Sequence, residues 1–195
     1  MDRFRDDDRE RYLWRMSERV LVACPRCHEQ GTVLREGPRF ACGRCGHAQR
    51  GGSGGYAGMA KASVNRKCGW CGQRISRIDR RPGPHPAKVG VCCAACRHWN
   101  YVPVSWTPDP QGEAYDPHFG FALWLQTRCV GQALWAYNAE HLAFLRGYVA
   151  ASIRERVPSA NGTLASRLPT WMKLAGNRVA VMRAIRRLEV KLAEA

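Results

Sequence analysis

Hydrophobic residues in the C-terminal part of the chain recur at helical spacing. The stretch 178–193 carries an apolar stripe formed by Val181, Met182, Ile185, Leu188 and Leu192. The stretch 139–156 has the same spacing at Leu142, Leu145, Tyr148 and Val149. A residue of N-cap type precedes each stretch, Asn138 the first and Asn177 the second. The pattern therefore predicts two amphipathic helices, with a short helical piece near residues 171–174 between them.

Shorter apolar runs elsewhere favour β-strands. Residues 121–127 and 133–137 are typical of two strands joined near Val130 and Gly131. In the first half of the chain, the strand-like segments are 31–34, 39–41, 73–78 and 88–91, with Gly- and Pro-containing turns between them. We predict a small α+β unit at the C-terminal end, preceded by β-hairpins.

Four Cys-x-x-Cys motifs lie at the ends of these predicted hairpins. Fourteen residues separate Cys27 from Cys42, and twenty-one separate Cys71 from Cys93. Each gap suits a β-hairpin that carries one motif back over the other, and two motifs together supply the four thiolates of a closed tetrahedral zinc site. The sequence predicts two structural Zn²⁺ ions, the first bound by Cys24, Cys27, Cys42 and Cys45, the second by Cys68, Cys71, Cys93 and Cys96.

Several alternatives remain open at this point. The doublet Cys92-Cys93 leaves one ligand ambiguous, and Cys93 is preferred because it has the two-residue spacing to Cys96. Disulfides would require an oxidising compartment, whereas the N-terminal residues do not resemble a signal peptide and no apolar run is long enough to span a membrane. We therefore expect a cytoplasmic protein with reduced thiols and no membrane partner. Four thiolates would also bind iron, alone or in a cluster.

Composition divides the chain into five segments. The predicted organisation is a charged N-terminal segment (1–19), a first zinc ribbon (20–50), a Gly-rich linker (51–62), a second zinc ribbon (63–105) and an α+β C-terminal domain (106–195). The Gly-rich linker predicts that the two ribbons have some independence from each other. The charged N-terminal segment has one apolar patch, which fits either a short docking helix or disorder.

The formal net charge of +15 is concentrated in two of these segments. Residues 51–105 hold nine Lys or Arg against one Asp, while residues 106–157 are slightly acidic. Such a surface attracts polyanions, of which we expect nucleic acid, DNA rather than RNA. The candidate contacts are Arg66, Lys67, Arg74, Arg77, Arg80 and Arg81 of the second ribbon, Arg183, Arg186 and Arg187 of the last helix, and the aromatic residues Trp70 and Trp99. Trp70 would either stack on an unpaired base or be covered by the C-terminal domain.

Motifs of enzymatic chemistry are missing from the sequence. It has no phosphate-binding loop, no dinucleotide fingerprint, no nucleophile elbow and no zinc-protease motif. Cys129 has no identifiable cationic partner, and the neighbours Asp116 with His118 and Glu140 with His141 do not assemble a dyad by spacing alone. We expect a protein without catalytic activity, although an enzyme built around the C-terminal domain stays possible.

The segments around the first two motifs, 24–27 and 40–47, resemble the zinc ribbons of transcription factors, primosomal helicases and ribosomal proteins. Residues 119–127 and 168–173 are loosely similar to small bacterial zinc-ribbon proteins without an established activity. The first resemblance implies a metal and a fold, and neither specifies a function. Our expectation is a nucleic-acid-binding zinc protein, and the alternative is an adaptor between proteins of a multi-protein bacterial complex. The sequence does not indicate an oligomeric state.

Overall fold

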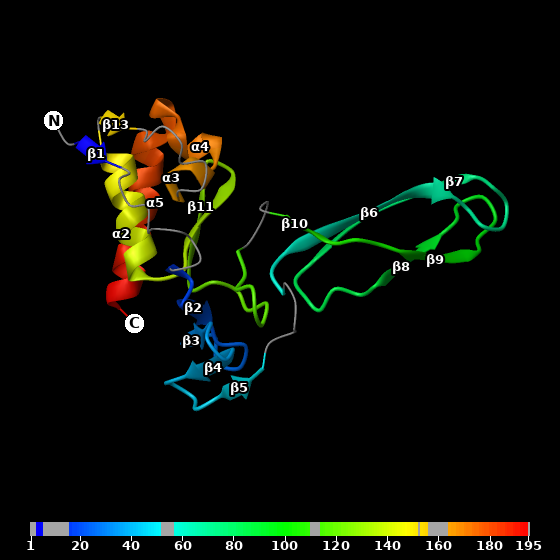
Figure 1. Ribbon diagram of the computed structural model, residues 1–195, viewed down its shortest axis with the longest axis horizontal. Helices are drawn as coiled ribbons and strands as arrows, with labels where there is room; N and C mark the ends of the chain where they lie inside the picture. The colour runs from blue at the N-terminus through cyan, green and yellow to red at the C-terminus, as the bar shows by residue number, and fades with distance from the viewer. Residues whose placement is uncertain are drawn as a thin grey trace.

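The structure is a computed structural model that describes residues 3–5, 16–51, 57–109, 114–151, 153–155 and 164–194. For residues 3–5, 108 and 153–155 it describes the backbone alone. Three parts can be distinguished: a first cysteine unit (residues 19–50), an arm (residues 57–109) and a body (residues 114–151 and 164–194). Figure 1 shows the arm extending sideways from the other two parts, with its far end well away from the body helices.

The first cysteine unit is a four-stranded antiparallel sheet in the order β2-β3-β4-β5. Its strands are β2 (Arg19–Ala23), β3 (Gln30–Leu34), β4 (Arg39–Cys42) and β5 (Ala48–Arg50). Phe40 is buried at its centre, and its ring covers Gly31, where a Cβ atom would lie 2.4 Å from the ring carbon Cε2. Only glycine fits at position 31 without moving that ring.

Strand β2 also joins the first cysteine unit to the body. The Leu21 N–H donates to the Tyr137 carbonyl at 2.7 Å, and the Trp124 N–H donates to the Leu21 carbonyl at 2.9 Å. Val22 forms an isolated bridge with Leu123, whose side chain is buried in the core of the first unit. The Gly-rich composition predicts a ribbon with some independence, whereas these bonds and the shared core join the first unit to the body.

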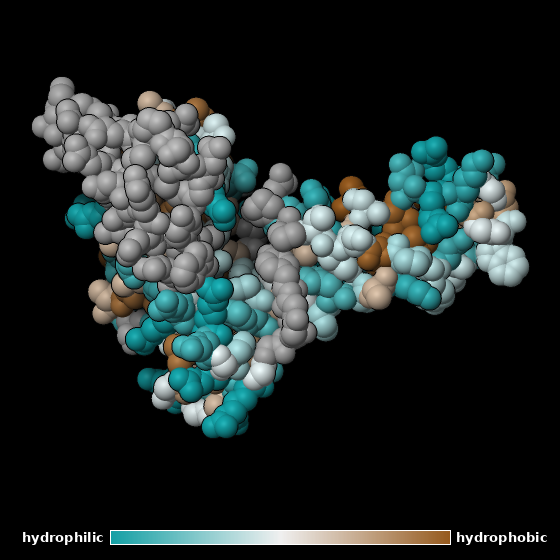
Figure 2. Space-filling model, viewed as in Figure 1, coloured by the Kyte–Doolittle hydropathy of each residue, from teal (hydrophilic) through white to brown (hydrophobic). Residues whose placement is uncertain are grey.

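The arm consists of two small antiparallel sheets. One is a three-stranded sheet in the order β10-β6-β7, formed by β10 (Thr107–Pro108), β6 (Ala60–Lys67) and β7 (Arg74–Arg81). The other is the hairpin of β8 (Lys88–Cys92) and β9 (Trp99–Pro103). Their facing sides enclose a small core of Val64, Ile75, Val89, Val91 and Val102 together with cysteine side chains. Figure 2 shows a largely hydrophilic surface at the far end of the arm and an apolar band nearer the body.

The body packs a hairpin and several helices around the largest hydrophobic core. The elements are β11 (Leu125–Cys129), β12 (Gln132–Ala136), α2 (Ala139–Ala150), α3 (Leu164–Arg167), α4 (Thr170–Lys173), the 3-10 turn η1 (Ala175–Asn177) and α5 (Arg178–Ala193). Helices α2 and α5 pack against each other, and α5 also lies on β11 (Figure 1). A parallel pair of short strands, β1 (Arg3–Arg5) and β13 (Ile153–Glu155), lies beside them.

Several element boundaries differ from the sequence prediction. Helix α2 ends at Ala150 rather than near residue 156, because Ala151 adopts an extended conformation. Strand β11 begins at Leu125 rather than at residue 121. Asn138 caps α2 as predicted by accepting the His141 N–H at 2.9 Å. The predicted cap at Asn177 is not formed, because the Asn177 side chain donates instead to the Trp171 carbonyl at 2.8 Å.

The arm is anchored to the body near its base. Ala57 is buried between Gly83 and Gly120: its N–H donates to the Pro117 carbonyl at 2.9 Å and its carbonyl accepts the Gly83 N–H at 2.8 Å. Gly120 has a positive φ of +71°, and a Cβ atom there would lie 2.5 Å from the Ala57 carbonyl oxygen. The loop at Gly120 therefore tolerates only glycine at this contact.

Within the arm, an ion pair and a backbone hydrogen bond close the base. Arg80 Nε donates to the buried carboxylate of Asp109 at 2.6 Å, and the Asp109 N–H donates to the Met59 carbonyl at 3.0 Å. Chain entry at Met59 and chain exit at Asp109 are thus held together.

Part of the sequence prediction lies outside the described residues. This applies to most of the charged N-terminal segment (6–15) and to the Gly-rich residues 52–56. Met16, from the apolar patch of the N-terminal segment, is buried in the body core. Among the described residues, no helix combines the length and the apolar character needed to cross a membrane.

We predict that Asp116→Asn destabilises the body by about 1–3 kcal/mol. The buried Asp116 carboxylate accepts the N–H groups of His118 and Phe119 on one oxygen and that of Phe121 on the other, at 2.9, 2.9 and 2.6 Å. An amide NH₂ in place of the second oxygen would face the Phe121 N–H with no acceptor. Chemical unfolding measures the difference, and the exposed Glu36→Gln variant should stay within about 0.5 kcal/mol of the parent protein. An unchanged stability for Asp116→Asn would contradict this account of the loop.

Candidate metal centres

All four Cys-x-x-Cys motifs fold into the same backbone turn. In each turn the N–H of the first cysteine donates to the carbonyl five residues later, and the N–H four residues later donates back to the carbonyl of the first cysteine. The forward bonds are Cys24 to Glu29, Cys42 to His47, Cys68 to Gln73 and Cys93 to His98, with N···O distances of 2.7–2.9 Å. The repetition shows that the turn is fixed by the motif and its immediate neighbours, not by the surrounding sheet.

The residue after the second cysteine of every turn has a positive φ. These residues are His28 (+62°), Gly46 (+69°), Gly72 (+71°) and Arg97 (+64°). Left-handed backbone favours glycine, so two of the four turns hold a side chain in an unfavourable conformation. We attribute this to the requirement that both sulfurs of a turn point to one side.

The eight sulfurs gather into two groups of four. Within each group all sulfur atoms lie within 4.8 Å of one another. The shortest separations are 3.6 Å (Cys27 to Cys42) and 3.7 Å (Cys24 to Cys45) in the first group, and 3.7 Å for both Cys68 to Cys96 and Cys71 to Cys93 in the second. A metal bound tetrahedrally by four thiolates at about 2.3 Å requires separations of about 3.8 Å, whereas a disulfide requires about 2.05 Å. The groups therefore have the dimensions of two four-thiolate metal sites.

The ambiguity at the cysteine doublet is resolved by these positions. Cys93 is buried and belongs to the second group, while Cys92 lies outside it on the exposed side of β8. The Cys92 thiol faces the Arg97 carbonyl at 3.5 Å. Strand alternation explains the outcome, because adjacent residues of a strand point to opposite faces and only one can face the metal.

The hydrogen bonds around the second group favour thiolate at the first cysteine of the Cys68 turn. Backbone N–H groups of Cys71 and Trp70 lower the pKa of Cys68 to about 6. The His98 N–H lowers the pKa of Cys96, but burial and the neighbouring sulfurs outweigh it and raise that pKa to about 12. Four thiolates this close repel one another, and a cation at the centre removes that repulsion.

Two further side chains lie beside the sulfurs. Asn100 on β9 donates from Nδ2 to the Cys68 sulfur at 3.4 Å and accepts the Gly69 N–H at 2.9 Å, which ties one turn to the opposite hairpin. His47 Nδ1 lies 3.9 Å from the Cys24 sulfur in the first group. Motif spacing gives no signal for Asn100, because the contact joins residues 32 positions apart.

The two groups differ in their surroundings. Cys24 and Cys42 share a core with Leu123 of the body, so the first group is part of the structure that joins the two units. The second group belongs to the arm, where Cys71 is exposed. Loss of metal from the first group should therefore disturb the body, while loss from the second should affect the arm alone.

The basic residues predicted to bind nucleic acid fall into two separate regions. Six of them lie on β6 and β7 of the arm and three on α5 of the body, and Figure 1 shows that the far end of β7 is remote from α5. Several have partners within the protein: Arg80 pairs with Asp109, while Arg77 and Arg81 both contact Asp79, at 3.8 and 2.7 Å. Arg66, Lys67 and Arg74, near the second cysteine group, are exposed.

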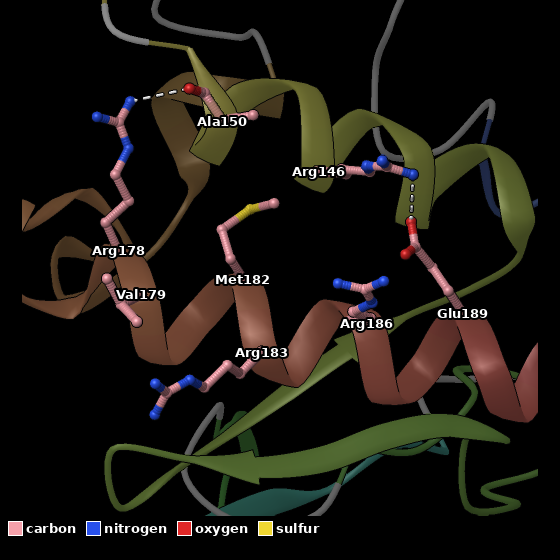
Figure 3. A pocket seen from close by; sticks show the side chains of 8 residues that line it. All are labelled: Arg146, Ala150, Arg178, Val179, Met182, Arg183, Arg186 and Glu189. Atoms are coloured by element: carbon pink, nitrogen blue, oxygen red, sulfur yellow. Dashed lines mark hydrogen bonds and ion pairs between the residues drawn. The ribbon is translucent and has the colours of Figure 1, made fainter.

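On α5, the cationic side chains serve different roles. Arg187 donates to the Arg128 carbonyl at 3.0 Å, which fixes it against β11. Arg183 and Arg186 are exposed beside a groove of about 730 Å³ between α2 and α5. Figure 3 shows Arg146 and Arg178, from the same groove, engaged with Glu189 of α5 and with the end of α2, respectively. Only part of the cationic α5 face is thus available to a ligand.

The tryptophans separate into exposed and covered ones. Trp70 is 70% exposed and stacks on His98, with ring centroids 4.6 Å apart, so it is not covered by the C-terminal domain. Trp99 is 57% exposed on β9. Trp124, Trp135 and Trp171 are partly buried against the cores of the body and the first unit.

His141 and Asp116, one from each pair of acid–histidine neighbours noted in the sequence, are both buried. His141 is buried, accepts the Tyr137 N–H on Nδ1 at 3.2 Å, and has its pKa lowered to about 4 by that burial. Asp116 is occupied by three backbone N–H groups, and burial raises the pKa of the Cys129 thiol. These groups are accounted for by packing and loop structure.

We predict that Gly46→Ala weakens metal binding by the first group about fivefold, whereas Gly43→Ala leaves it nearly unchanged. Both glycines lie in or directly after the Cys42–Cys45 turn, and a Cβ atom at either would meet nothing within 4 Å. The two differ in backbone conformation, because only Gly46 has a positive φ. Competition with a chromogenic chelator measures both affinities, and equal losses would contradict the role assigned to the left-handed residue.

Replacing one sulfur in each group should have unequal structural consequences. Cys42→Ser and Cys93→Ser should each reduce the metal content from two ions to one per chain, as measured by elemental analysis. Hydrogen exchange should then show loss of protection in the body for Cys42→Ser, because the first core includes Leu123, and in the arm alone for Cys93→Ser. Retention of two ions by either variant would rule out the corresponding site.

Comparison of the chain with protein-family models, curated proteins and solved structures finds no match. The function must therefore be inferred from the residues themselves.

Proposed function

We propose that this protein binds zinc and that its arm binds nucleic acid, with a preference for DNA over RNA. Zinc suits two closed sites of four cysteine thiolates, since it binds four thiolates tetrahedrally and needs no further ligand. In this proposal the two metal-bound units are zinc ribbons, and their role is structural. Elemental analysis of the purified protein distinguishes zinc from iron, which would also give visible absorption.

The observation that carries the nucleic-acid proposal is the charge on the outer face of the β6–β7 hairpin. Along that face, β6 places Lys61, Ser63, Asn65 and Lys67, and β7 places Arg74, Ser76, Ile78 and Arg80. It carries four cationic side chains and no acidic one. An extended basic face of this kind is typical of surfaces that track a phosphate backbone.

The pairing of these residues strengthens the argument. Lys67 lies directly opposite Arg74, and Lys61 lies directly opposite Arg80, whose charge is offset by its ion pair with Asp109. Like charges at opposed positions of an antiparallel pair oppose folding. The Lys67–Arg74 pair is therefore the costly one, and a polyanion is a ligand that would turn its repulsion into attraction. The net charge of +15 favours the same class of ligand.

Binding of the metal-loaded protein to labelled DNA and RNA across a range of salt concentrations tests the proposal. For duplex DNA, we expect log affinity to fall linearly with log salt, by about 0.9 per phosphate contact. The double variant Lys67→Gln/Arg74→Gln, which removes two opposed cations of this face, should weaken binding and lower this slope by about 1.8. Both side chains are exposed near the second cysteine group, so their replacement should leave the metal content unchanged.

Two further double variants serve as comparisons. Arg26→Gln/Arg44→Gln removes the same amount of charge from exposed positions in the first two turns and should change the slope little. Arg183→Gln/Arg186→Gln measures whether α5 takes part. Absence of binding at low salt would overturn the nucleic-acid proposal and favour the alternative, an adaptor that binds other proteins through its exposed aromatic residues.

A further inference from the structure

The β8–β9 hairpin exposes large aromatic side chains on the face that would ordinarily carry polar ones. Val89, Val91 and Val102 point into the arm core. On the opposite face, Trp99 is 57% and Tyr101 is 72% exposed. Two large aromatic side chains exposed to solvent on one strand of a small hairpin indicate a binding surface.

A glycine opposite these rings gives the face its shape. Gly90 is the direct cross-strand partner of Tyr101. A Cβ atom on Gly90 would lie 3.3 Å from Trp99 Cε3 and 3.4 Å from Tyr101 Cε1. Both rings therefore approach the backbone at Gly90 closely, and both stay largely exposed to solvent. We refer to Trp99, Tyr101 and Gly90 as the aromatic platform.

Positive charge borders the platform. Arg77 of β7 donates from Nη1 to the Gly90 carbonyl at 3.1 Å, which places its guanidinium at the edge of the β8–β9 sheet. The acidic residues of the arm are Asp79, which contacts Arg77 and Arg81, and Asp109, which is buried against Arg80. The platform thus combines flat apolar rings with one neighbouring guanidinium, that of Arg77, and both carboxylates of the described arm residues are paired with arginines.

A second pair of rings lies at the two turns that hold the second cysteine group. His98 precedes Trp99 and stacks against Trp70 of the facing Cys68–Cys71 turn, with an interplanar angle of 25°. The Trp70 backbone N–H also donates to the Cys68 sulfur at 3.5 Å. The Trp70 backbone is therefore held beside the second cysteine group, so that aromatic faces and the candidate metal site belong to one end of the arm.

We infer that the aromatic platform binds unpaired bases, so that the protein prefers single-stranded to double-stranded nucleic acid. The inference rests on the proposed function and adds the class of nucleic acid. Alternate residues of an antiparallel strand stand about 6.8 Å apart, which lets Trp99 and Tyr101 each receive one base of an extended strand. Duplex bases cover each other's faces, so a duplex can meet the phosphate-binding residues but cannot use the rings.

Anisotropy titrations of a labelled oligodeoxythymidine and of a mixed-sequence duplex at one salt concentration test the inference. We expect tighter binding of the single strand. Trp99→Ala and Tyr101→Ala should each weaken single-strand binding about 5- to 150-fold and leave duplex binding unchanged. Tyr101→Phe keeps the ring and should keep the affinity. The substituted side chains are exposed, and an unchanged content of two metal ions verifies that the variants fold.

The outcomes separate this inference from the proposed function. Equal affinity for single strand and duplex, or single-strand affinity unchanged in both alanine variants, would overturn the platform while the salt-dependent binding stands. The rings would then be assigned to a protein contact. Failure of the parent protein to bind either nucleic acid at low salt would overturn the proposed function and the platform together. Lys67→Gln/Arg74→Gln should weaken binding of both ligands, which distinguishes phosphate contacts from ring contacts.

Discussion

The convergence of four sulfurs on one point, achieved twice, is the constraint on which the rest of the structure depends. Each group joins two turns that are distant in sequence, and each turn is closed by the same pair of backbone hydrogen bonds. The sheets next to these turns are small. A unit of about 30 residues does not bury enough apolar surface to fold without a metal, a disulfide or a partner. Metal binding at such sites is worth about 10–16 kcal/mol, which is then available as folding free energy.

The two cysteine groups lie in different surroundings. The first is built into a core shared with the body, and strand β2 bonds to residues on either side of β11–β12. The second supports an arm whose surface is unusually costly, with opposed like charges on β6 and β7 and exposed rings on β9. With metal bound as proposed, the binding free energy of the second group would offset the cost of this surface. In that proposal, stability and ligand binding are supplied by different groups of atoms.

Local patterns in the sequence predicted much of this arrangement, and non-local contacts account for what they missed. Cysteine spacing identified the eight sulfurs that cluster, because a two-residue gap is a local geometric requirement. Helical periodicity located α2 and α5, and Asn138 was recognisable as a cap because its bond spans three residues. Spacing could not indicate that Asn100 contacts Cys68, that Arg80 is paired with a buried Asp109, or that Arg187 is fixed on β11. Each of those depends on how separate strands come together, and together they reduce the set of basic residues open to a ligand.

The contact between Met59 and Asp109 makes the arm an insertion with its two ends joined. The chain leaves the rest of the molecule and returns within one hydrogen bond of 3.0 Å, and β10 pairs with β6 just beyond that point. The entropy of closing so long an excursion is set at its base and rises only slowly with its length. The arm can therefore lengthen, shorten or exchange its tip during evolution without a matching change in the body. One scaffold could then present different binding surfaces in different descendants.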